Sequence, residues 1–186
     1  MFQKVTLSIV VFLAVIIQIA VLPNFFSPGT IPDLFLVLVI LWTIRRGFEK
    51  VLPWTVLAGF FLDLAYHWAV GISVISLALV TFGINSLAKR FLALQGVSRA
   101  FMMIALVVFG TIANDLFSGV LIKIFDYLKN DIIGTNLPNF LDYKIFIKII
   151  YNIFVLAIIY WPVEKLENML NFYGQRASVQ SRFFQR

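Results

Sequence analysis

The sequence contains no cysteine and a single histidine, and only 13% of its residues are charged. Without cysteine there is no disulfide and no thiolate metal site, and a lone histidine excludes paired-histidine metal motifs. Glycine-rich phosphate loops and nucleotide-binding fingerprints are also missing, so we expect no cofactor and no metal ion. Soluble domains carry about 25% charged residues. A chain with so few cannot cover a water-exposed surface with polar side chains.

Apolar residues make up 61% of the chain and fall in long uninterrupted runs. The runs Val5–Leu22 and Phe101–Phe109 show no alternation of period two, which a transmembrane β-barrel would require. A membrane-spanning helix takes about 20 residues, so a chain of 186 residues has room for about six. We therefore predict an all-α integral membrane protein with six transmembrane helices.

Loops rich in proline, glycine or charge separate the apolar segments. Pro162 is expected to end the last span, and apolar residues at helical spacing after it predict an amphipathic surface helix ending at Gly174. The predicted domains are a six-helix transmembrane domain over residues 1–163 and a cytoplasmic amphipathic tail over residues 164–186. The predicted spans are residues 5–22, 34–44 (or from 31), 51–68, 72–87, 100–122 and 145–161.

The distribution of lysine and arginine predicts the orientation, because cytoplasmic loops of membrane proteins are enriched in basic residues. With six spans and a cytoplasmic N-terminus, 11 basic residues lie inside, among them Arg45 and Arg46 in a tight basic turn. Both termini are then cytoplasmic. The net charge of +6 fits contact with anionic lipid, so no nucleic-acid partner is expected. The 4 basic residues left outside are Lys123, Lys129, Lys144 and Lys148.

Two aspartates, Asp63 and Asp115, lie at membrane depth, where a charge costs about 2.5–3.5 kcal/mol on insertion scales. Both are predicted in the outer half of the membrane, facing protein. Small and polar residues lie close to both of them and would allow close helix contacts and hydrogen bonds between helices. We therefore predict helix or partner contacts at Gly59, Asp63, His67, Gly110, Asn114 and Asp115.

Several interpretations of these aspartates remain open. They can hold helices or a partner subunit together, or form a proton or ion path through Asp63, His67 and Asp115. A protease dyad is disfavoured because neither aspartate follows a Gly-x-Gly pattern, and a rhomboid-like site is disfavoured because no Gly-x-Ser motif accompanies the histidine. We expect no enzymatic activity.

Residues 31–47 read Ile-Pro-Asp-Leu-Phe-Leu-Val-Leu-Val-Ile-Leu-Trp-Thr-Ile-Arg-Arg-Gly. This run resembles the second span of the rod shape-determining MreD family. Residues 59–64, Gly-Phe-Phe-Leu-Asp-Leu, are similar to the third span of that family, although Ala69 and Val70 replace the usual Pro-Leu before Gly71. Length, number of spans and order agree across nearly the whole chain, and the specific motifs lie within residues 31–80.

The resemblance implies a non-enzymatic scaffold subunit in the bacterial cytoplasmic (inner) membrane. Such a subunit binds MreC and works beside MreB filaments, RodA and a penicillin-binding protein to direct lateral peptidoglycan synthesis and rod cell shape. The family fold is similar to the S-components of vitamin transporters, so the alternative function is a small-molecule-binding transporter subunit. That alternative requires a polar pocket in the outer half, and we expect no wider polar set on the first and sixth spans.

Overall fold

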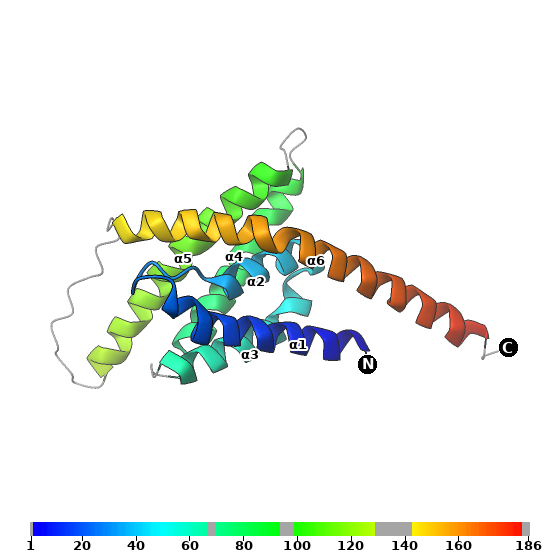
Figure 1. Cartoon of the computed structure of the whole chain (residues 1–186), viewed down its shortest axis with the longest axis horizontal. Coiled ribbons are helices and arrows are strands. Elements are labelled where there is room, and N and C mark those ends of the chain that lie inside the picture. The colour runs from blue at the N-terminus through cyan, green and yellow to red at the C-terminus, as the bar shows by residue number, and fades with distance from the viewer. Residues whose placement is uncertain (1, 67–69, 94–98, 129–142, 184–186) are drawn as a thin grey trace.

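The computed structural model describes residues 2–66, 70–93, 99–128 and 143–183 (Figure 1). These residues form six α-helices and contain no strand, which confirms the all-helical prediction. A π-helical turn, η1 (Ile17–Val21), and a 3-10 turn, η2 (Leu22–Asn24), continue the first helix. The helices are α1 (Phe2–Ile16), α2 (Leu34–Arg46), α3 (Phe48–Tyr66), α4 (Ile72–Ala93), α5 (Arg99–Leu128) and α6 (Tyr143–Phe183).

The short helix α2 forms the centre of the bundle. Its 13 residues contact all five other helices, and every side chain from Phe35 to Thr43 is buried. At 1.5 Å per residue α2 is about 20 Å long, which is shorter than the hydrocarbon core of about 30 Å. Its neighbours therefore bury the middle of the helix, whereas Arg45 in its last turn is exposed.

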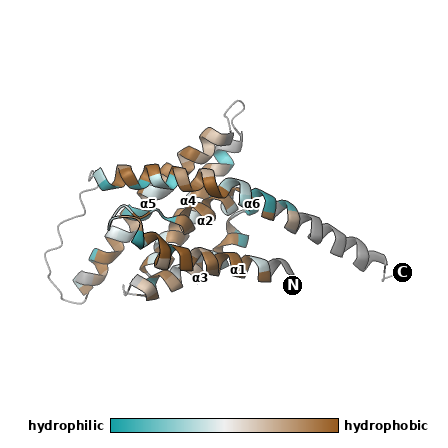
Figure 2. Ribbon diagram, viewed as in Figure 1, coloured by the Kyte–Doolittle hydropathy of each residue, from teal (hydrophilic) through white to brown (hydrophobic). Residues whose placement is uncertain are grey.

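Four helical segments among the described residues are long and apolar enough to cross a membrane. Figure 2 shows hydrophobic residues along most of the bundle, with hydrophilic residues mainly near helix ends and near the middle of α6. Length and composition thus indicate an integral membrane protein. The other two helices do not meet these criteria for a membrane-spanning segment. The helix α2 is too short, and α3 contains three charged residues, Glu49, Lys50 and Asp63. The four segments are Val5–Asn24, Ile72–Arg90, Ala100–Phe125 and Tyr143–Leu166.

The helix α6 does not end where the sequence predicted. It continues through Pro162 and past Gly174 for 41 residues, so both predicted helix ends were wrong. Proline lacks the N–H that would bond to the preceding turn, and inside a helix it can cause a kink without ending the helix. Figure 1 shows α6 changing direction part-way along its length. The side chains after Met169 lie outside the described residues, so the amphipathic tail stays a prediction.

Two glycines lie where helices approach closely. A Cβ atom on Gly59 would lie 2.7 Å from Val74 Cα and 2.9 Å from Val74 N, which are backbone atoms of α4. A Cβ atom on Gly110 would lie 2.7 Å from Cδ1 of Ile40, the end of a flexible side chain. The α3–α4 contact therefore requires glycine more strictly than the α5–α2 contact.

We predict that Gly59→Ala destabilises the protein by about 1–3 kcal/mol, because the backbone of α4 cannot move without opening the contact. Gly110→Ala is the matched control: the Ile40 side chain can rotate, and alanine favours helix by about 0.5–1 kcal/mol over glycine. Thermal unfolding in detergent, followed by tryptophan fluorescence, measures both variants. Equal melting temperatures for the two variants would contradict the prediction.

Candidate functional site

The first backbone N–H groups of α2 are bound by side chains from other helices. Asp33 N–H donates to Asn152 Oδ1 at 2.7 Å, and Phe35 N–H donates to Gln18 Oε1 at 2.9 Å. The first N–H groups of any helix lack partners within the helix, and inside a membrane no water replaces them. Gln18 in η1 and Asn152 in α6 therefore cap α2 from either side.

Both capping amides use their second polar atom as well. Gln18 Nε2 donates to Asp33 Oδ1 at 3.0 Å, and Asn152 Nδ2 donates to Thr111 Oγ1 of α5 at 2.8 Å. Gln18 is 3% exposed and Asn152 is fully buried. Gln18 lies in the π-helical turn, a feature often found at functional sites.

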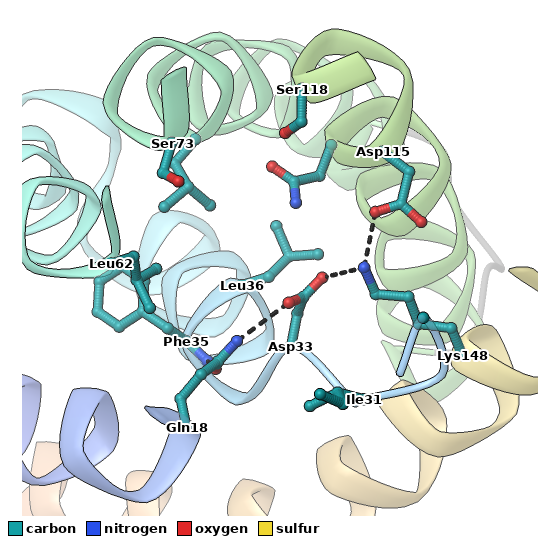
Figure 3. Close-up of a pocket in the computed structure, with 13 residues that line it drawn as sticks. Gln18, Ile31, Asp33, Phe35, Leu36, Leu62, Ser73, Asp115, Ser118 and Lys148 are labelled. Carbon is teal, nitrogen blue, oxygen red and sulfur yellow. Dashed lines mark hydrogen bonds and ion pairs between the residues drawn. The ribbon is translucent and has the colours of Figure 1, made fainter. Parts of the chain in front are cut away.

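Lys148 of α6 lies between two carboxylates. Its Nζ is 2.7 Å from Asp33 Oδ2, just before α2, and 2.6 Å from Asp115 Oδ1 of α5 (Figure 3). The three side chains are only 14–24% exposed, so the charges interact with little screening by water. The group, which we call the Asp33–Lys148–Asp115 triad, carries a formal charge of −1.

The triad lines a cavity of about 250 Å³ to which all six helices or their continuations contribute. Figure 3 shows Ser73 and Ser118 across this space from Asp33, with Leu36 and Leu62 supplying part of the apolar wall. We call the end of the bundle at which α2 and α4 begin the capped end, and the cavity lies there. Its lining residues are Gln18, Gly29, Ile31, Asp33, Phe35, Leu36, Leu62, Ser73, Leu77, Asn114, Asp115, Ser118 and Lys148.

Asp63 caps a different helix at the capped end. Its carboxylate accepts the N–H of Gly71 at 2.7 Å and of Ser73 at 2.8 Å, so it caps α4 from α3. It is 1% exposed and does not line the cavity. Asp63 and Asp115 share no partner among the described residues, so the geometry does not form a two-carboxylate dyad. His67 lies outside the described residues.

The remaining predicted positions lie at helix contacts or at a helix end. Asn114 Oδ1 of α5 accepts a hydrogen bond from Ser76 Oγ of α4 at 2.8 Å. Arg45 and Arg46 form the last turn of α2, where cations interact favourably with the final carbonyl groups. The Arg45 guanidinium also lies 5.4 Å from the centre of the Tyr160 ring.

The sequence profile described as rod shape-determining protein MreD matches residues 1–170. The chain belongs to the MreD family. Family membership supports a role in determining cell shape. No curated protein and no solved structure matches the chain, so the expected likeness to a transporter S-component fold gains no support from the comparisons.

Sequence reasoning missed four residues of this MreD site: Gln18, Asp33, Lys148 and Asn152. Lys148 was counted among the outer charges, whereas it lies inside the bundle between two carboxylates. The expected lack of a wider polar set on the first and last spans was also wrong. The spacing of Lys148 and Asn152 holds a usable signal, because polar residues four apart on an apolar helix share one face.

We predict that Lys148→Met destabilises the protein by about 3–5 kcal/mol, because two carboxylates are left without their cation. Lys165→Met is the control on the same helix, since Lys165 is exposed. Unfolding in detergent compares the two. The triple variant Asp33→Asn, Asp115→Asn, Lys148→Met should recover part of the loss, because no uncompensated charge remains. Equal stability of Lys148→Met and Lys165→Met would contradict the prediction.

Proposed function

We propose that this MreD family member is a non-enzymatic scaffold subunit of the bacterial elongation machinery. In this proposal it binds MreC and helps direct lateral peptidoglycan synthesis, with RodA, a penicillin-binding protein and MreB as direct or indirect partners. The match of the family profile over residues 1–170 is the observation that carries the proposal.

We also propose that the chain crosses the inner membrane six times with both termini in the cytoplasm. Figure 1 places the N and C labels toward the same side of the molecule, which supports this arrangement. The caps on α2 support its inclusion as a short span, because Asn152 and Gln18 accept two of the N–H groups at its start and so reduce the cost of burying them. Lys148 lies inside the bundle, so it no longer counts among the basic residues of the outer loops. The excess of basic residues on the cytoplasmic side is therefore larger than the sequence analysis assumed.

The predicted contact residues are proposed to support the partner interaction indirectly. Gly59 and Gly110 face other helices of the same chain, and Asp63 caps α4. Asn114 and Asp115 bond to Ser76 and Lys148. Polar groups that hold helices together at membrane depth are what a rigid scaffold requires. In this proposal they hold the helices whose outer faces meet the partner.

The absence of native cysteine allows a direct test of the topology. We predict that single cysteines at Phe25 and Tyr127, which are 77% and 83% exposed, react with a membrane-impermeant maleimide added to intact spheroplasts. Cysteines at Lys50 and Lys89, also exposed, should react only after permeabilisation. Reaction of all four sites from one side would contradict six spans, and the reversed pattern would contradict the orientation.

Co-purification with a candidate MreC tests the function. We predict that tagged full-length chain, co-expressed with MreC, retains it in mild detergent, whereas an unrelated single-span membrane protein at the same expression level is lost. The control variant Lys165→Met should retain MreC as the wild type does. Failure of a well-folded chain to retain MreC would contradict the proposal.

The transporter-subunit alternative keeps one supporting observation, the polar cavity at the capped end. Substrate sites usually combine apolar walls with a few convergent polar groups. An increase in melting temperature on adding a vitamin, together with no MreC complex, would favour the alternative over the scaffold.

A further inference from the structure

The cavity at the capped end has unsatisfied bonding capacity. Asp115 uses only Oδ1, toward Lys148, and no hydrogen bond to its Oδ2 is found among the described residues (Figure 3). The hydroxyl of Ser73 is likewise unpaired within the described residues, although its backbone N–H binds Asp63. Ser118 donates to Ser76, which leaves its oxygen able to accept. The second carboxylate oxygen of Asp115 and the hydroxyl oxygens of the two serines can therefore each accept a hydrogen bond from a ligand.

The charge of the triad also favours a positively charged ligand. Two carboxylates face one ammonium group, so the site carries a formal charge of −1 in surroundings where an uncompensated charge is costly. A bound monovalent cation brings the sum to zero, whereas an anion doubles the excess. A metal ion is a poor fit, because no group of three or more His, Cys, Asp or Glu side chains able to hold one occurs among the described residues.

The size and walls of the cavity limit the ligand further. An engineered cavity of about 150 Å³ holds benzene, so a cavity of about 250 Å³ accommodates a small organic molecule. Leu36, Leu62 and Leu77 form an apolar wall that would contact a short hydrocarbon chain. Asp115, Ser73 and Ser118 line the same cavity and supply the groups that would bind the polar end of a ligand (Figure 3).

We propose that this cavity binds a small primary amine in its protonated form. The ammonium group donates to Asp115 Oδ2 and to a serine hydroxyl, while the short apolar part of the ligand packs on the leucines. Asp115 then bridges two cations, Lys148 on one oxygen and the ligand on the other. This binding is independent of MreC, so either property can fail without the other.

Thermal unfolding of the full chain in detergent tests the proposal, with n-butylammonium, butan-1-ol and butyrate as probes of similar size. We expect n-butylammonium at about ten times its Kd to raise the melting temperature by about 3–6 °C, and the alcohol and the carboxylate to raise it less. In Asp115→Asn the Kd should increase about tenfold or more, because a charge-assisted hydrogen bond is lost.

Two further variants separate the site from the fold. Glu49→Gln removes an exposed acidic charge outside the cavity and should keep the response to n-butylammonium. Ser118→Leu fills the cavity while leaving the triad intact and should abolish the response, which keeps the test valid if Asp115→Asn fails to fold. An equal effect of butan-1-ol, a larger effect of butyrate, or no shift with any probe would overturn the proposal.

Discussion

The first turn of α2 imposes the constraint on which the rest of the bundle depends. Its N–H groups lie inside the protein, where each unpaired group would cost several kcal/mol. Gln18 and Asn152 supply the acceptors, which fixes η1 and α6 against α2. Asp33 then holds Lys148, and Lys148 reaches Asp115 on α5. One unsatisfied helix end thus organises four segments of the chain.

The same solution occurs at the start of α4, where Asp63 of α3 accepts two backbone N–H groups. Both caps come from neighbouring helices, so the helices cannot separate without exposing polar groups to lipid. The opposite end of α2 carries Arg45 and Arg46. The side chains that cap helices and the charged triad therefore lie at the capped end, where they hold the bundle together and line a polar cavity.

Much of the fold could be predicted from sequence, because apolar runs of helical length are a strong signal. The six helices overlap the six predicted spans, although α6 runs to Phe183 and not to residue 161, and Gly59 and Gly110 lie at close helix approaches. The end at Pro162 was wrong because proline alone does not decide whether a helix ends or bends. Lys148 was misassigned because its partners, Asp33 and Asp115, lie far from it in the sequence. Only the fold brings the three side chains together.

The sequence by itself determined the solvent, the helical class and the family, since these follow from composition, run length and local motifs. Tertiary structure alone decided the site. Gln18 and Asp33 are isolated polar residues in their own segments. Asp115 and Lys148 have polar neighbours, but no local pattern states which of the four side chains will meet. The packing of α2 against all its neighbours determines their partners, because only that packing brings each buried N–H group and each charge close to a group that can bond to it.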